Sequence, residues 1–185
     1  MDFLALGLVA HVGFNVEGQI YVIPMSYQYD LEEPSRIYLH GGHSSRLLGH
    51  LAAGVPVCVE VTLVDGLVYS RAALYHSVNY RSVVVFGTAR ELTDTARKAK
   101  VLERMIERYF PGRTAGVDYA ASTSVELNAT AMVEVVIEEM SAKKREGPPK
   151  GPTDLLPEAL GSCGVADRVD GVRSQWNAPW VTNRL

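Results

Sequence analysis

The chain has 185 residues, of which 47% are hydrophobic and 21% are charged, and its formal net charge is −3. This composition supports one domain, or two at most, with a real apolar core, and it excludes wholesale disorder. The small negative charge argues against a nucleic-acid binder, and no apolar stretch approaches the roughly 20 residues of a membrane span.

The first forty residues predict three β-strands. Residues 7–14 form the first, the Glu-Gly pair at 17–18 predicts a tight turn, and 19–29 is the hairpin partner. Pro24 in this partner cannot donate to a strand ladder, so it indicates a bulge or an edge position. Residues 36–40 predict the third strand.

A short helix follows at 45–53 and ends at Gly54. Residues 55–63 are dense in β-branched side chains and predict a central strand. The Asp-Gly pair at 65–66 predicts a hairpin turn, with 67–71 as the strand that returns from it.

The second half begins with the clearest strand of the sequence, at 81–91. Residues 94–110 then change to helical periodicity, with Thr93 or Asp94 as the cap and the Pro-Gly pair at 111–112 as the end. The apolar face of this helix comprises Ala99, Leu102, Met105, Ile106 and Tyr109, and the charged residues Lys98, Lys100, Glu103, Arg104, Glu107 and Arg108 are expected mostly away from it.

A short helix is expected near 123–129 and a last strand at 131–140, after which 145–153 is a proline-glycine linker. Six or seven antiparallel strands with two or more inserted helices predict a mainly β (α+β) fold, a small β-barrel with helices at its ends. We expect residues 1–150 to form this domain and 151–185 to form an atypical C-terminal tail.

The loop at 40–46, His-Gly-Gly-His-Ser-Ser-Arg, has the composition of an anion site. Glycines let backbone amides approach an anion, Ser44 and Ser45 stand at the start of the helix, and Arg46 adds a bidentate donor. The alternative is that Ser44 or Ser45 only caps the helix and that Arg46 is solvated.

The segment at 76–82, His-Ser-Val-Asn-Tyr-Arg-Ser, leads directly into an apolar strand. Asn79, Arg81 and Ser82 could hydrogen-bond the edge of a heteroaromatic ring, and Tyr80 could pack on its face. The alternative is an ordinary start of a strand with Arg81 paired to a surface carboxylate.

Other site types lack support. His40 and His43 have a spacing seen among metal ligands, but no cysteine or carboxylate cluster follows to complete a shell, so we expect no metal site. No GxGxxG, Walker or GxSxG motif is present, which excludes the usual Rossmann, P-loop and α/β-hydrolase signatures. With no secretory signal, a cytoplasmic protein is expected, and a disulfide between Cys58 and Cys163 is therefore not expected.

Three stretches in this order resemble a known family: VAHVGFNVEGQIYVIPMSYQYD, RIYLHGGHSSRLLGHLAAGVPVCVEVTLVDGLV and HSVNYRSVVVFGTAREL. The chain is similar over about residues 6–150 to the FMN-binding split-barrel proteins, in the pyridoxamine 5′-phosphate oxidase-like branch that includes the nitroimidazole-resistance (Nim) proteins. The resemblance implies an antiparallel split β-barrel that forms a homodimer, with two FMN molecules in clefts between the subunits.

The resemblance also implies roles for single residues. Ser45 and Arg46 match a pair that grips the flavin phosphate, although Leu47 replaces the lysine that follows in the oxidases. His40 matches a histidine beside the flavin in Nim proteins. The cofactor-binding set implied in this way, together with the two segments above, is Pro24, Met25, Ser26, Tyr27, His40, Gly41, Ser44, Ser45, Arg46, Asn79, Tyr80, Arg81 and Ser82.

Two departures from the family pattern stand out. The chain begins close to its first strand, without the helix-bearing leader that relatives usually carry, and the segment at 161–185, with Trp176 and Trp180, does not match the expected ending. The oxidase signature for the pyridoxal substrate is also not recognisable, so true pyridoxamine-phosphate oxidase activity is not expected.

The resemblance implies an FMN-dependent oxidoreductase with a small-molecule substrate, for which nitro-heterocycles or quinones are candidates. His40 is the candidate proton donor to the reduced substrate. Two alternatives stay open: a non-catalytic module that stores or senses flavin, and a haem protein with His40, His43 or His76 as the axial ligand.

Overall fold

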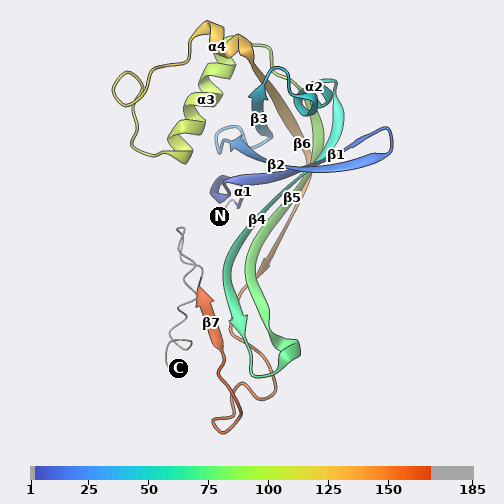
Figure 1. Cartoon of the computed structure of the whole chain (residues 1–185), viewed down its shortest axis with the longest axis vertical. Helices are drawn as coiled ribbons and strands as arrows, with labels where there is room; N and C mark the ends of the chain where they lie inside the picture. The colour runs from blue at the N-terminus through green and yellow to red at the C-terminus, as the bar shows by residue number, and fades with distance from the viewer. Residues whose placement is uncertain (1–2, 168–185) are drawn as a thin grey trace. The chain divides into compact units, whose positions relative to one another are not determined.

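The computed structural model describes residues 3–167. The chain divides into two compact units. The barrel unit comprises Met1–Val61 and Val83–Ser141, and the second unit comprises Thr62–Ser82 and Ala142–Leu185. Three long strands, β4 (Val55–Tyr69), β5 (Ser77–Glu91) and β6 (Thr130–Arg145), contribute residues to both units (Figure 1).

Within residues 3–167 the strands form one sheet in the order β1-β2-β3-β6-β5-β4-β7, and a further pairing of β1 with β4 closes six of them into a ring. The remaining strands are β1 (Val9–Val16), β2 (Gln19–Tyr29), β3 (Arg36–Gly42) and β7 (Gly164–Asp167). The pairs β1–β2, β1–β4, β2–β3, β3–β6 and β4–β7 are antiparallel. The predicted antiparallel β-barrel is confirmed.

The helices are short except for one. They are α1 (Phe3–Leu6), α2 (Arg46–Ala52), α3 (Thr95–Tyr109) and α4 (Ser124–Ala129), with a 3₁₀ turn, η1, at Ala73–Tyr75. The helices expected near 45–53, 94–110 and 123–129 are thereby confirmed. None of the helices within residues 3–167 has the length and apolarity needed to cross a membrane.

The core of the barrel unit is made by alternate residues of the strands. Along β4, Val57, Val59 and Val61 are buried while the residues between them are partly accessible. Burying each such side chain stabilises the fold by about 1.5–3 kcal/mol. The largest fully buried side chains include Tyr27, Leu4, Ile37, Leu39, Leu48, Leu51 and Met132.

The β1–β2 hairpin follows the sequence prediction closely. Glu17 and Gly18 both have positive φ (51° and 89°), as a two-residue hairpin turn requires, and Asn15 Oδ1 accepts a hydrogen bond of 2.9 Å from Gly18 N. The register with β1 is continuous past Pro24, so the bulge alternative is wrong. On the other side, β3 pairs only with Tyr27–Tyr29, which confirms the edge position of Pro24.

The hairpin turn predicted at Asp65-Gly66 is wrong, because β4 continues through it to Tyr69. An Asp-Gly pair permits a turn but does not require one. Here Asp65 binds Arg81, and a Cβ at Gly66 would lie 2.8 Å from the carbonyl oxygen of Ala166 on β7. The glycine therefore serves close strand pairing, and the chain turns later, at residues 70–76.

Helix α3 begins where predicted, with the Asp94 carboxylate accepting from the amides of Ala96 and Arg97. Its inward face is more charged than predicted. Lys98 is buried and donates to the Thr130 carbonyl (3.0 Å), and Arg108 donates to backbone carbonyls of α1 and β2. Backbone carbonyls of α1, β2 and β6 bind these cations, and hydrophobic periodicity cannot reveal such contacts.

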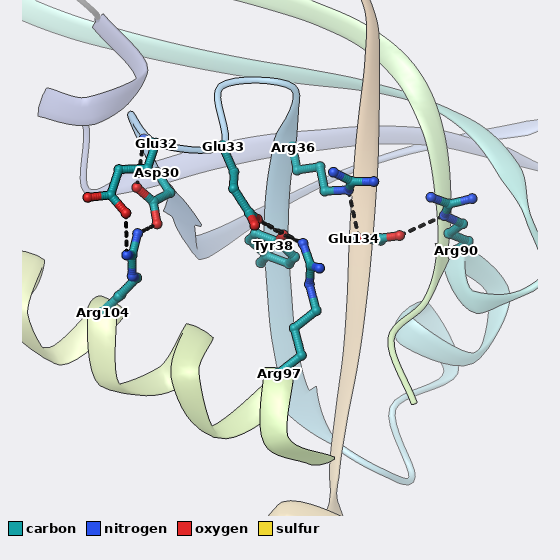
Figure 2. Close-up of polar contacts among 9 residues, drawn as sticks. All are labelled: Asp30, Glu32, Glu33, Arg36, Tyr38, Arg90, Arg97, Arg104 and Glu134. Carbon is teal, nitrogen blue, oxygen red and sulfur yellow. Dashed lines mark hydrogen bonds and ion pairs between the residues drawn. The ribbon is translucent and has the colours of Figure 1, made fainter. Parts of the chain in front are cut away.

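Arginine–carboxylate contacts join the strands near α3 (Figure 2). Glu134 of β6 is only 8% exposed and lies between two cations, 3.0 Å from Arg36 Nε and 2.7 Å from Arg90 Nε. A buried carboxylate with two cationic partners is far less costly than an unpaired one.

After residue 145 the described chain is anchored within the second unit. The Asp154 carboxylate accepts from Ser70 Oγ (2.9 Å), from Arg71 N (2.7 Å) and from Gly151 N (2.5 Å). Residues 164–167 then pair with β4 as β7. Residues 168–185, with Trp176 and Trp180, lie outside the described residues, and the domain boundary at residue 150 stays a prediction.

Candidate functional site

The loop at 40–46 connects β3 to α2 in the barrel unit. His40, Gly41 and Gly42 still pair with β6, and His43 N then donates to the Ala129 carbonyl (3.1 Å). A Cβ at Gly41 would lie 3.0 Å from Leu48 Cδ1, so glycine here allows α2 to pack closely on the end of β3. The sequence predicted this strand–loop–helix order correctly.

The serines and the arginine of the loop differ in their contacts. Ser45 caps α2, since its hydroxyl accepts from Leu48 N (3.3 Å). Ser44 and Arg46 are exposed, and no residue among 3–167 forms an ion pair with Arg46. The Ser45 hydroxyl is therefore engaged in capping the helix, whereas the Arg46 guanidinium is available to bind a phosphate ligand.

His40 is half-buried at the end of β3, opposite Met132. Burial lowers the pKa of its imidazole, so the ring is neutral at pH 7. No described residue hydrogen-bonds the ring. A neutral imidazole with a free nitrogen can accept a proton, accept a hydrogen bond or ligate a metal.

The candidate residues 24–27 alternate along β2. Pro24 and Ser26 are exposed, whereas Met25 packs against the core. Tyr27 is fully buried: its hydroxyl donates to the Leu4 carbonyl (2.5 Å) and its backbone N–H donates to Tyr109 Oη (3.1 Å). The side chain of Tyr27 is thus part of the core rather than open to a ligand.

Arg81 lies in the second unit and binds Asp65 with two nitrogens. Its Nε is 2.9 Å from Oδ2 and its Nη2 is 2.5 Å from Oδ1 of that carboxylate. The hydrogen bond from Arg81 holds the pKa of Asp65 below its usual range. The alternative that paired Arg81 with a carboxylate is the arrangement observed, and sequence reasoning missed Asp65 because it assigned this residue to a turn.

The neighbours of Arg81 are also engaged inside the second unit. Asn79 is 7% exposed; its Nδ2 donates to the Gly147 carbonyl (3.1 Å) and its Oδ1 accepts from Arg145. Lys143 Nζ lies 6.0 Å from the centre of the Tyr80 ring. Ser82 is half-buried. The amide of Asn79 therefore anchors the segment after β6.

The predicted residues thus form two groups, 24–27 with 40–46 in the barrel unit and 79–82 in the second unit. The residues that sequence reasoning missed are Asp65, Arg145 and Asp154, which are acidic or basic side chains in segments assigned to a turn, a proline-glycine linker and a tail. Within residues 3–167, no three His, Cys, Asp or Glu side chains gather so as to hold a metal ion.

Comparison with known proteins shows which family has this architecture. The family model described as pyridoxamine 5′-phosphate oxidase matches residues 1–144. No curated protein matches the chain.

Solved structures are similar over most of the chain. A FAD and heme binding protein from Mycobacterium smegmatis is 29% identical, with a TM-score of 0.78 over 94% of this chain and 87% of that one. The flavocytochrome Anf3 from Azotobacter vinelandii is 31% identical, with a TM-score of 0.74 over 92% of this chain and 77% of that one. A protein named for 5-nitroimidazole antibiotic resistance, from Bacteroides thetaiotaomicron, shares the fold at 20% identity, with a TM-score of 0.60 over 76% of this chain and 78% of that one. This chain belongs to the pyridoxamine 5′-phosphate oxidase-like family of flavin-binding split-barrel proteins.

Proposed function

We propose that this protein is a flavin-dependent oxidoreductase that passes electrons to a small electrophile such as a nitro-heterocycle or a quinone. The observation that carries the proposal is the exposed, unpaired Arg46 beside Ser44 in a glycine-containing loop of a flavin-binding family. A flavin bound there would supply hydride transfer chemistry.

The residues of the barrel unit fit such a ligand by their chemistry. Arg46 offers a charge-assisted donor to the phosphate, and the Ser44 hydroxyl is free to add a second one. His40 presents a neutral, unbonded ring at the end of β3. The lowered pKa leaves less of the protonated form that the proton-donor role expected from the sequence requires, whereas a neutral ring can accept a hydrogen bond or ligate a metal.

FMN is the flavin that the sequence resemblance implies, whereas the Mycobacterium smegmatis relative at 29% identity is named for FAD. Both carry the phosphate that Arg46 would bind. The mass of the flavin released from the purified protein by heat distinguishes them. Protein that holds neither flavin, and that does not bind FMN or FAD on titration, would refute the proposal.

Turnover separates an oxidoreductase from a module that only stores flavin. We expect the flavin of the loaded protein to be reduced by a nicotinamide donor and reoxidised by a quinone or a nitroimidazole in the absence of oxygen. Stable binding with no exchange of electrons in either direction would favour the storage or sensing alternative.

A second candidate, a flavocytochrome that holds haem beside the flavin, is favoured by a specific observation. Two relatives are named for haem or as a flavocytochrome, and His40 has the neutral, unbonded imidazole that iron requires. His43 is exposed, and the His76 ring contacts the Ala73 carbonyl (3.2 Å). A Soret band that disappears in His40→Ala but not in His43→Ala would establish this candidate.

A further inference from the structure

A pocket of about 320 Å³ lies between helix α3 and the turn that joins β2 to β3. Two arginines of α3 bind the carboxylates of this turn, Arg97 to Glu33 (2.8 Å) and Arg104 to Glu32 (2.5 Å) and to Asp30 (Figure 2). The arginines are seven residues apart, so they lie two turns apart on one helix face. The volume is at the lower end of the range in which small molecules bind.

The side chains at the floor of the pocket are buried, and most of their polar atoms form hydrogen bonds. Gln28 and Tyr38 face each other across β2 and β3, so both side chains point to the same side of the sheet, and they are 5% and 3% exposed. The Tyr38 hydroxyl donates to Glu33 (2.8 Å) and accepts from Arg97 (2.6 Å). Val101 of α3, 7% exposed, completes the floor.

Gln28 is the exception in this floor. Its Oε1 is buried, yet no described residue donates a hydrogen bond to it. A buried amide acceptor without a donor is costly to folding and rare in native proteins. Rotation of the terminal amide by about 180° exchanges Oε1 with Nε2 and turns the acceptor toward the pocket that the side chain lines, where a ligand N–H can bind it.

The charges around the pocket favour a cation. Four carboxylates and three cationic side chains line it. Arg104 binds two of the carboxylates and Arg97 binds a third, whereas Asp94 and Lys100 form no ion pair with a described residue, so the lining carries one net negative charge. Lys100, which is exposed, can turn its ammonium group to solvent.

We propose that this pocket binds a small organic cation whose ammonium or guanidinium group donates a hydrogen bond to Gln28 Oε1. None of its residues belongs to the flavin site proposed above. Binding at this pocket is therefore tested independently of flavin binding.

Calorimetric titration of the whole chain with three probes of equal chain length tests the charge preference. The probes are putrescine, its uncharged diol analogue and succinate. We expect putrescine to bind at least about tenfold more tightly than the diol, and succinate not to bind.

Two variants test the residues. Gln28→Leu should weaken putrescine binding by about tenfold or more while leaving the melting temperature unchanged or raised, because leucine fills a similar volume and removes the unpaired acceptor. The matched control is Gln19→Leu, at an exposed glutamine outside the pocket, which should change neither value. Lys100→Ala should tighten putrescine binding by about twofold to fivefold, since it removes a like charge.

Several outcomes would overturn the proposal. These are a preference for succinate that Lys100→Ala abolishes, equal affinity for putrescine and the diol, no binding of any probe, or unchanged putrescine binding in Gln28→Leu. A melting temperature lowered by Gln28→Leu without loss of putrescine binding would assign Gln28 a structural role only.

Discussion

Arg46 is the residue on which the proposed flavin site depends most. We expect Arg46→Ala to weaken flavin binding by at least about tenfold, because a charge-assisted hydrogen bond to phosphate contributes about 1.5–3 kcal/mol. Fluorescence titration with FMN and with FAD measures the effect. Arg46→Lys should retain part of the affinity, and Lys150→Ala, which removes an exposed cation elsewhere, should retain all of it. An unchanged dissociation constant in Arg46→Ala would assign this residue to the solvated surface.

His40 should make stability depend on pH. Burial lowers its pKa in the folded chain, whereas the unfolded chain has a value of about 6.5. Between these two values the unfolded chain binds more protons, so the free energy of unfolding decreases as the pH falls through this window. The melting temperature of the wild type relative to that of His40→Gln should therefore fall as the pH is lowered from 7.5 to about 5. The melting temperature of His43→Gln, at an exposed histidine, should change with pH in parallel with that of the wild type. A parallel change in His40→Gln as well would show that the His40 ring is solvated.

At this scale, sequence predicted the types of residues better than their partners. The loop at 40–46 was placed correctly between a strand and a helix, because its glycines follow the β3 pattern and Ser45 stands at the start of α2, and its role as a phosphate site stays a prediction. Asp65 was not identified as the partner of Arg81, because the two residues are 16 apart in sequence and meet only across paired strands. Such a contact depends on strand register, which local pattern does not specify.

At the scale of elements, glycine has opposite effects in a strand and in a helix. A Cβ at Gly87 of β5 would lie 2.0 Å from the Val136 carbonyl oxygen of β6, whereas nothing lies within 4 Å of a Cβ at Gly49 in α2. We expect Gly87→Ala to destabilise the protein by about 1–3 kcal/mol, because β5 and β6 must separate to make room for the methyl group. We expect Gly49→Ala to stabilise it by about 0.5–1 kcal/mol through the helix preference of alanine. Urea unfolding of both variants checks the signs, and a loss of equal size at the two sites would contradict the close approach of β5 and β6.

The segment that follows β6 depends on one carboxylate. Asp154 binds Ser70 and two backbone amides, so Asp154→Ala should open residues 146–156 and speed their cleavage in limited proteolysis by about tenfold or more. Hydrogen bonds from these groups lower the pKa of Asp154. The protection is therefore present above the unfolded pKa and is lost as the pH falls through the lower folded value. Glu158→Gln, an exposed neighbour, should be cleaved at the wild-type rate. Equal cleavage of both variants would show that Asp154 does not hold the segment.

Element boundaries were predictable where a chemical stop signal coincided with a change in periodicity. The cap at Asp94 and the hairpin at residues 17–18 are examples. The end of β4 was predicted wrongly because Asp65-Gly66 satisfies a turn signal while a long-range contact requires the glycine for strand pairing. The burial of Lys98 likewise depends on the Thr130 carbonyl that its ammonium group binds, and the helical periodicity of the sequence does not predict this contact.

At the scale of the whole molecule, the barrel unit exposes apolar side chains on β2. Ile20 is 69% exposed and Val22 is 62% exposed, and their spacing of two residues places them on one side of the strand. Exposed apolar side chains that are neighbours on one side of a strand commonly mark a contact with another chain. The family resemblance of the sequence also implies flavin clefts shared between two subunits.

We therefore expect a homodimer that contacts its partner through this side of β2 and that needs the partner to hold its flavin. Light scattering at micromolar concentration should give twice the chain mass of 20.2 kDa. Val22→Asp should shift the mass toward one chain and weaken flavin binding in parallel, because a carboxylate in an apolar interface is costly. Leu155→Asp, at a 93% exposed leucine outside the barrel unit, should change neither property. A wild-type mass of one chain with tightly bound flavin would show that a single subunit completes the site. A dimeric Val22→Asp would move the interface away from β2.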